Sequence, residues 1–112
     1  MKKSYRIKKE KEFQTIIHAK QSYANRNFVV YHLNNSENPH FRVGISVGKK
    51  IGNAVTRNRV KRLIRQSLFD LKMRIEPDQD IIIIARPNVV GLSQQDVKSN
   101  IEHVLGLANL IK

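Results

Sequence analysis

The chain has 112 residues and no cysteine, so it has room for one hydrophobic core and contains no disulfide or thiolate metal ligand. Its 21 lysines and arginines outnumber 9 acidic residues, which leaves a net charge of +12. This composition excludes zinc fingers and cysteine nucleophiles, and it favours a nucleic-acid partner because a polyanion relieves repulsion among the cations. We expect one domain in the cytoplasm, since no apolar leader or membrane-length segment is present.

The first part of the chain is predicted to be a basic tail followed by a short helix. We expect residues 1–8 to be flexible and residues 9–20 to be helical. Phe13, Ile16 and Ile17 recur at helical spacing, which favours a helix face packed on a sheet. A membrane-surface helix is the alternative use of such a basic, amphipathic segment.

Several segments have the pattern of β-strands. Residues 27–33 carry apolar side chains on both faces and are predicted as a central strand. Residues 41–47 follow a polar loop, alternate apolar with polar or small side chains, and are predicted as the hairpin partner of that strand. The isoleucine run at residues 81–85 suits a strand covered on both faces, and a further short strand is expected near residues 21–24.

A long basic helix is predicted at residues 54–75. On a helical wheel its apolar side chains form one stripe: Val60, Leu63, Ile64, Leu71 and Ile75. Residues 49–65 hold seven lysines and arginines and no acid. Such a run is usually a solvated surface, but the missing acidic partners and the presence of Asn58 among arginines favour a bound polyanion.

The polar side chains of this helix lie beside its apolar stripe. The neighbouring arc holds Arg57, Asn58, Lys61, Arg62 and Arg65. Arg59 points away from both groups. The turn before the helix places Gly48 and Gly52 beside Lys49 and Lys50, but without the spacing of a Walker loop or a KH-type clamp. A phosphate-binding turn and a purely structural turn are therefore both open.

The last helix is predicted to begin after Ser93, which can accept a backbone N–H, with Asp96 opposing the helix dipole. Its apolar residues follow at helical spacing: Val97, Ile101, Val104, Leu105, Ala108 and Ile111. This helix should pack against the sheet. The predicted order of elements is α-β-β-(β)-α-β-α, with the bracketed strand being the short one.

No catalytic group and no metal site is predicted in the protein. The four histidines are scattered without ligand spacing, and no paired-carboxylate or Ser-His-Asp arrangement is supported. A second candidate surface joins Phe13, Ile17 and Tyr31 with Arg42 and Ser46, because an aromatic ring near basic and small residues can stack a single-stranded base. From spacing alone, an ordinary core is the better interpretation of these residues.

Residues 42–65 read RVGISVGKKIGNAVTRNRVKRLIR and resemble the signature of the bacterial ribonuclease P protein subunit. The hallmark Arg-Asn-x-x-Lys-Arg-x-x-Arg follows a Lys-Lys-x-Gly-Asn-Ala turn and falls on Arg57, Asn58, Lys61, Arg62 and Arg65. The similarity extends to Phe13, to residues 24–26, to Tyr31, and to the strand that ends at Arg86. It departs at Ile17, where the family often has an aromatic residue, and at Gly48, where serine is common.

The resemblance implies an α/β (α+β) two-layer sandwich around a central mixed sheet, similar to the second domain of ribosomal protein S5. It also implies a left-handed crossover between the parallel strands, whereas the general rule predicts a right-handed one. Residues 1–112 would then form a single RNA-binding domain.

The resemblance further implies a protein cofactor that helps a catalytic RNA remove the 5′ leader from precursor tRNA. Mg²⁺ would be bound mainly by the RNA, with no cofactor intrinsic to the protein and neither DNA nor membrane as a partner. The residues implied in binding the catalytic RNA are Lys49, Lys50, Asn53, Arg57, Asn58, Arg59, Lys61, Arg62 and Arg65. Those implied in binding the leader are Phe13, Ile17, Tyr31, Arg42 and Ser46.

Two other classes of protein fit the same charge. A ribosomal or rRNA-binding protein without a catalytic role would need an equally basic surface. A protein nuclease would need a carboxylate or histidine constellation, and the sequence gives no support for one.

Overall fold

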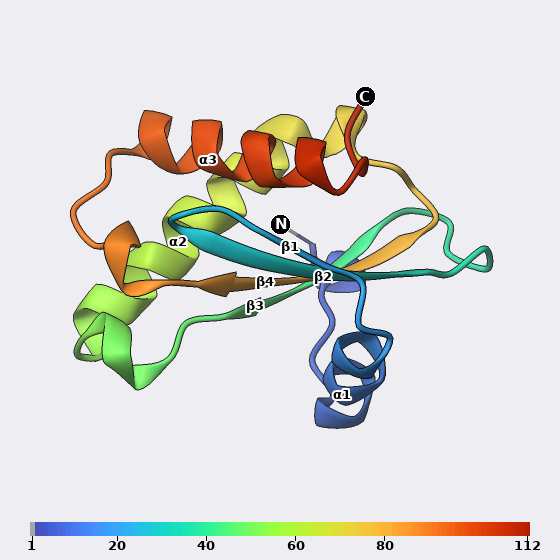
Figure 1. Ribbon diagram of the computed structural model, residues 1–112, viewed down its shortest axis with the longest axis horizontal. Helices are drawn as coiled ribbons and strands as arrows, with labels where there is room; N and C mark the ends of the chain where they lie inside the picture. Colours follow the sequence, from blue (N-terminus) through green and yellow to red (C-terminus); the bar gives the residue numbers. More distant parts are fainter. Residues whose placement is uncertain (1) are drawn as a thin grey trace.

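Four strands form one mixed sheet in the order β1-β2-β4-β3 (Figure 1). The computed structural model describes residues 2–112, and Met1 lies outside the described residues. The strands are β1 (Ser22–Ala24), β2 (Phe28–Asn34), β3 (Arg42–Ser46) and β4 (Gln79–Ala85). β2 is antiparallel to both β1 and β4, whereas β3 is parallel to β4. The predicted mixed sheet and short first strand are confirmed.

Helices cover both faces of the sheet, but unequally. The helices are α1 (Glu10–His18), α2 (Ala54–Leu71) and α3 (Gln94–Leu107), with short 3-10 turns at Lys3–Tyr5, Lys49–Ile51, Lys72–Arg74 and Pro87–Val89. α2 and α3 lie side by side on one face, and α1 lies on the other (Figure 1). The α+β class and the order of elements agree with the prediction, and α1 adds cover beyond a strict two-layer sandwich. Within residues 2–112, no helix has an apolar stretch long enough to cross a membrane.

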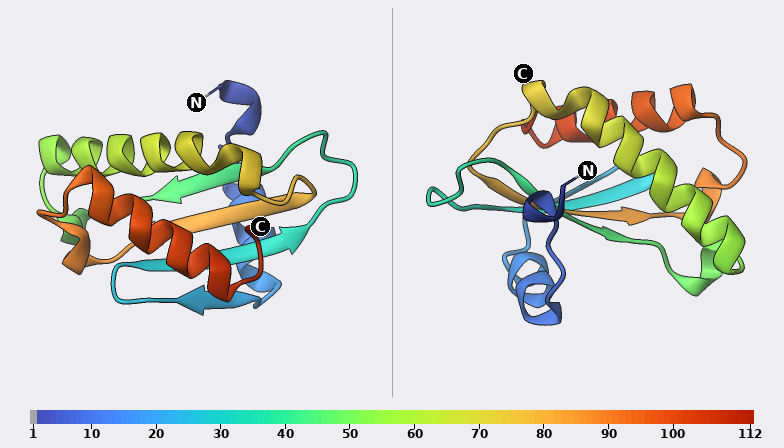
Figure 2. Two further views of the ribbon diagram at one scale, coloured as in Figure 1. Left: turned by 90° about the horizontal axis from the view of Figure 1, so that it is seen from above. Right: turned by 180° about the vertical axis from the view of Figure 1, so that it is seen from behind.

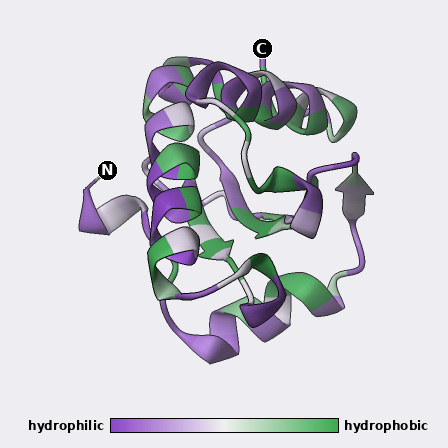
Figure 3. Cartoon of the chain, turned by 90° about the vertical axis from the view of Figure 1, so that its left-hand side faces the viewer, coloured by the Kyte–Doolittle hydropathy of each residue, from purple (hydrophilic) through white to green (hydrophobic). Residues whose placement is uncertain are grey.

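The main core lies between the sheet and the helices α2 and α3. Val60, Ile64 and Leu71 of the predicted stripe are buried, and hydrophobic and hydrophilic residues alternate along α2 (Figure 3). Leu63 is only half-buried against this core, and Ile75 is buried after the helix has ended. On α3, the predicted cap is present because the Ser93 hydroxyl accepts the N–H of Asp96.

The predicted hairpin between β2 and β3 is wrong. β4 lies between these strands, so that Tyr31 of β2 and Gly44 of β3 flank Ile82 from opposite sides. The central place suits β4 because Ile81, Ile82 and Ile83 are fully buried and need cover on both faces and both edges. β3 is parallel to β4, and the connection between them therefore requires the long crossover through α2.

The crossover from β3 through α2 to β4 is left-handed. In Figure 2 (left), α2 lies on the viewer's side of the sheet, β3 points to the left, and β4 lies below it and runs parallel to it. The arrangement departs from the general right-handed rule and agrees with the handedness implied by the family resemblance.

The N-terminal segment packs against the sheet at Tyr5 and Ile7, whereas a flexible tail was predicted over residues 1–8, of which Met1 lies outside the described residues. Ile7 is 4% exposed and its N–H donates to the carbonyl of Val43. The ring of Tyr5 stacks on His40 with centroids 3.7 Å apart. The apolar Ile7 fills a small cluster with Ile16 and Ile82 on the α1 side of the sheet, so basic composition was a poor guide to its order.

Candidate nucleic-acid interface

The turn before α2 holds two exposed lysines in place. Ile51 is buried and anchors the turn, which leaves Lys49 and Lys50 exposed. Gly52 has a φ of 151°, and a Cβ there would lie 3.1 Å from Thr56, so the position favours glycine. The Asn53 side chain accepts the N–H of Thr56 at 3.0 Å and thereby caps α2. Asn53, which was predicted to contact RNA, therefore has its oxygen engaged within the turn.

The α2 basic arc, which we define as Arg57, Asn58, Lys61, Arg62 and Arg65, runs along one side of the helix. Asn58 and Arg62 are exposed, whereas the other three residues are half-buried. None of the five forms an ion pair within residues 2–112. The Nε atoms of Arg57 and Arg65 are buried and have no hydrogen-bond partner in the described part of the chain. The arc is thus a row of donors without acceptors.

Burial lowers the pKa of the Arg65 guanidinium, and the nearby charge of Arg6 lowers it further. Like charges repel, and an anion placed beside them would relieve that repulsion. The N-terminal segment therefore adds positive charge to the arc, which the local pattern of α2 did not reveal.

Arg59 lies apart from the arc. One of its Nη atoms donates to the carbonyl of Leu92 at 3.4 Å, in the loop that leads to α3. The sequence placed Arg59 away from its neighbours on the wheel, and the structure identifies an intramolecular acceptor for it.

Most residues of the second candidate surface, which was predicted to bind the leader, lie on the face of the sheet that α1 covers. Strand register aligns Tyr31, Ile82 and Gly44 in one row across three strands. The Phe13 ring lies directly over Gly44, where a Cβ would be only 2.5 Å from the ring. Tyr31 and Phe13 pack at the edge of the same small cluster. Glycine at position 44 is therefore what lets α1 approach the sheet this closely.

The remaining predicted residues of this surface have separate roles. Ser46 follows Gly44 by two positions, so its side chain is on the α1 face, where it is half-buried. Ile17 is half-buried on α1 but is not among the residues that pack in the cluster.

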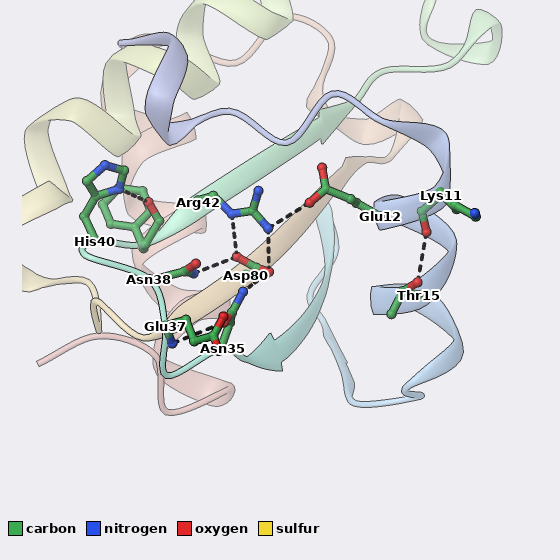
Figure 4. A network of polar contacts seen from close by, with 10 residues as sticks. Lys11, Glu12, Thr15, Asn35, Glu37, Asn38, His40, Arg42 and Asp80 are labelled. Carbon is green, nitrogen blue, oxygen red and sulfur yellow. Dashed lines mark hydrogen bonds and ion pairs between the residues drawn. The ribbon is translucent and has the colours of Figure 1, made fainter.

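Arg42 lies at the centre of a polar network (Figure 4). Its Nε and Nη2 atoms donate to the two carboxylate oxygens of Asp80 at 3.0 and 2.9 Å, and Nη2 also lies 3.0 Å from Glu12. Asp80 further accepts hydrogen bonds from Asn38 at 2.8 Å and from Asn35 at 3.2 Å. The charge of Arg42 is thus engaged by two carboxylates, and the network connects α1, β3, β4 and the loop before β3.

Titration behaviour follows from this geometry. Burial of the Asp80 carboxyl raises its pKa, but the hydrogen bonds from Arg42, Asn38 and Asn35 outweigh that effect, so the net pKa is below the ordinary value. The hydrogen bond to Asp80 raises the pKa of Arg42. Both groups are therefore charged at neutral pH.

Sequence reasoning missed this network. Asp80 is the second residue of β4, and its side chain is only 7% exposed. Its partner Arg42 lies on a strand that was predicted to pair elsewhere. No local pattern indicates the contact, because the register of two distant strands creates it. Within residues 2–112, no three histidine or acidic side chains gather as metal ligands.

Comparisons with known proteins agree with one another. A family model described as Ribonuclease P matches residues 1–109. The ribonuclease P protein component of Enterococcus faecalis is 65% identical over 111 residues, which cover 99% of this chain and 94% of that protein. The Staphylococcus aureus RNase P protein structure has 47% identity and a TM-score of 0.89, covering 96% of this chain and 98% of that one. The RNase P protein from Thermotoga maritima has 28% identity and a TM-score of 0.82, covering 89% and 94%.

Proposed function

Because the chain belongs to the ribonuclease P protein family, we propose that it is the RNA-binding cofactor that helps the catalytic RNA remove the 5′ leader from precursor tRNA. In this proposal the whole chain acts as a single RNA-binding domain in the cytoplasm. The α2 basic arc binds the catalytic RNA, and the α1 face binds the leader.

The observation that carries the proposal is the unpaired state of the α2 basic arc. A folded protein usually satisfies buried donors, and orphaned ones call for an explanation. The Nε atoms of Arg57 and Arg65 are buried without a hydrogen-bond partner in residues 2–112. The arc also has no acidic partner in that part of the chain. Guanidinium groups bind phosphate through several donors at once, so an RNA backbone would supply the missing acceptors. Lys49 and Lys50 extend the same surface across the turn.

The α1 face would hold the leader by stacking and apolar contact. Phe13 and Tyr31 are both half-buried there, and Ser46 is half-buried on the same face. Single-stranded bases stack on aromatic rings without regard to sequence, which suits a leader that varies between tRNAs. Arg42 would act in this surface by fixing α1 through Glu12 and not as a free phosphate ligand. Ile17 would contribute apolar contact.

The protein would position the RNA substrates, and the RNA would carry out the reaction. Neutralising phosphates lowers the repulsion between the two RNAs and so helps Mg²⁺ occupy sites in the RNA. Holding the leader converts part of the binding energy into orientation of the scissile phosphate.

The direct test adds purified protein to precursor tRNA at low Mg²⁺, with and without ribonuclease P RNA. We expect cleavage at the leader junction only when both are present. Cleavage by the protein alone would identify a nuclease, and the absence of any stimulation of the RNA would reject the cofactor role. Copurification with ribosomal subunits in place of ribonuclease P RNA would favour the ribosomal alternative.

A variant separates the two surfaces. Tyr31→Ala should weaken binding of precursor tRNA to the assembled enzyme about 5-fold to 150-fold, because a stacked base contributes about 1–3 kcal/mol. The same variant should bind mature tRNA as the unchanged protein does. Tyr31→Phe, which keeps the ring, is the matched control. Equal losses of affinity for precursor and mature tRNA would contradict the assignment of leader binding to the α1 face.

A further inference from the structure

Two hollows lie along the last turns of α2, and the N-terminal segment lines one of them. The N-terminal turn lies beside the C-terminal half of α2 in Figure 2 (left). One hollow, of about 320 Å³, is lined by Lys2, Tyr5, Phe41, Phe69 and Lys72. The other, of about 370 Å³, is lined by Arg62, Arg65, Gln66 and Phe69. Phe69 lines both hollows, and we call the two together the Phe69 groove.

The lining of the Phe69 groove is basic and aromatic. Lys2 and Lys72 lie at one end, Arg62 and Arg65 lie at the other, and no lining residue is acidic. The nearest acid along α2 is Asp70, whose carboxylate accepts a hydrogen bond from Gln66 at 3.0 Å. The groove therefore attracts anions along its whole length.

Phe69 is exposed to an unusual degree for its size. The side chain is 49% exposed, and the Lys72 ammonium lies 4.5 Å from its ring centroid. The ring packs in no core cluster of the described residues. A large apolar ring that is flanked by cations is the arrangement with which proteins stack nucleobases next to bound phosphates.

We propose that the Phe69 groove binds one unpaired nucleotide of the partner RNA, with the base stacked on Phe69 and the flanking phosphates held by Lys72 and Arg65. The proposal rests on the function proposed above, because the groove continues the α2 basic arc toward the end of the helix. Arg65 borders both surfaces, and its half-buried side chain lines the hollow in which one phosphate would lie.

The chemistry favours RNA over the other occupants of such a groove. A second copy of this chain would bring another +12 of charge against the same cations. A base-paired duplex hides its base faces and could not stack on Phe69. An unpaired nucleotide supplies both a free ring face and two phosphates.

The experiment uses tryptophan as a stacking probe, because the chain has no tryptophan of its own. Phe69→Trp is titrated with ribonuclease P RNA and, separately, with a short single-stranded oligoadenylate. Anisotropy of the labelled RNA reports binding, and tryptophan emission reports stacking. Tyr23→Trp is the matched control: Tyr23 is 40% exposed and lies on β1, at the edge of the sheet opposite β3.

We expect the emission of Trp at position 69 to be quenched in step with the anisotropy change, and the emission at position 23 to stay constant. Phe69→Ala should weaken RNA binding about 5-fold to 150-fold, and its thermal midpoint should show that the protein is still folded. Phe69→Ala removes an exposed ring, so a folded variant is expected.

Other results overturn the proposal in distinguishable ways. If ribonuclease P RNA binds with unchanged emission at position 69, the groove assignment fails while the proposed function stands. If oligoadenylate quenches the emission and ribonuclease P RNA does not bind, the groove holds and the proposed partner fails. If neither RNA binds, both proposals fail. An emission change that follows protein concentration without RNA would mean that a second copy occupies the groove.

Discussion

The α2 basic arc and the Arg42 network lie on opposite faces of one sheet, and they use positive charge in opposite ways. On the arc, Arg57 and Arg65 have buried donors with no acceptor in residues 2–112. On the α1 face, Arg42 makes two hydrogen bonds with Asp80 and an ion pair with Glu12. The difference separates charge that is engaged within the fold from charge that has no acidic partner in residues 2–112.

This distinction explains why residue type alone is a poor guide to binding. Arg42 and Arg62 are both arginines in the stretch that resembles the family signature, yet only Arg62 is exposed and free of carboxylates among the described residues. A cation with two carboxylate partners has little to gain from a phosphate, because binding it would first break the existing contacts. Phosphate binding to the α2 basic arc would break no carboxylate contact, because the arc forms none in residues 2–112.

The largest expected effect comes from breaking the Arg42 network at its buried centre. Asp80→Ala leaves Arg42 with only Glu12 and removes the acceptor for Asn35 and Asn38. We expect the free energy of unfolding to fall by about 3 kcal/mol, at the low end of the range for buried pairs because Arg42 keeps one partner. Urea denaturation of the variant and the unchanged protein measures this loss in the free energy of unfolding.

Asp78→Ala is the control for that change. Its carboxylate lies two residues before Asp80 and accepts only an exposed contact from Asn34. A loss below about 0.5 kcal/mol is expected there. Equal stability of the two variants would show that the network does not hold the α1 face together.

The next effect concerns how closely α1 approaches the sheet. Gly44→Ala would place a Cβ 2.5 Å from the Phe13 ring and 2.9 Å from Ile82, so that α1 must shift. We expect a loss of about 1–3 kcal/mol by overpacking, measured by thermal unfolding. Gly106→Ala in α3 is the control, since nothing lies within 4 Å of its Cβ and alanine favours the helix. Comparable stability of the two variants would contradict the close packing at Gly44.

A smaller effect is the pH dependence of the network. The pKa of Asp80 is lower in the folded protein than the ordinary value of 3.8, so its stabilising contribution is complete above pH 3.8. That contribution is lost as the pH falls through the folded-state pKa. Urea titrations at decreasing pH should show a steeper loss for the unchanged protein than for Asp80→Asn. Parallel curves would mean that Asp80 does not titrate with folding.

Much of the fold could be predicted from local patterns. The stripe on α2, the cap at Ser93 and the buried isoleucines of β4 depend on residues that are near one another in sequence. The cap and the isoleucines are confirmed, and the stripe is confirmed at Val60, Ile64 and Leu71. Strand pairing depends on distant residues instead. A polar loop between two strands fits a hairpin, but the central place of β4 changes the partner of β3, which local alternation does not specify.

In the candidate site, too, features set by neighbouring residues could be predicted, and features set by distant residues could not. The α2 basic arc could be predicted because helical period alone sets which of its residues share a side. The engagement of Arg42 could not, because Asp80 reaches it through strand register and Glu12 reaches it through the docking of α1. The N-terminal wall of the Phe69 groove was likewise hidden, since residues 1–8 were predicted to be flexible.

The central claim is that arginines on the two faces serve different ends, and one paired measurement tests it most directly. Arg62→Ala and Arg42→Ala are compared for the free energy of unfolding and for the salt dependence of binding to ribonuclease P RNA. For Arg62→Ala we predict unchanged stability and a slope of log K against log salt that is smaller by about 0.7–0.9. For Arg42→Ala we predict a clear loss of stability and an unchanged slope. A reduced slope with full stability in Arg42→Ala would contradict the account.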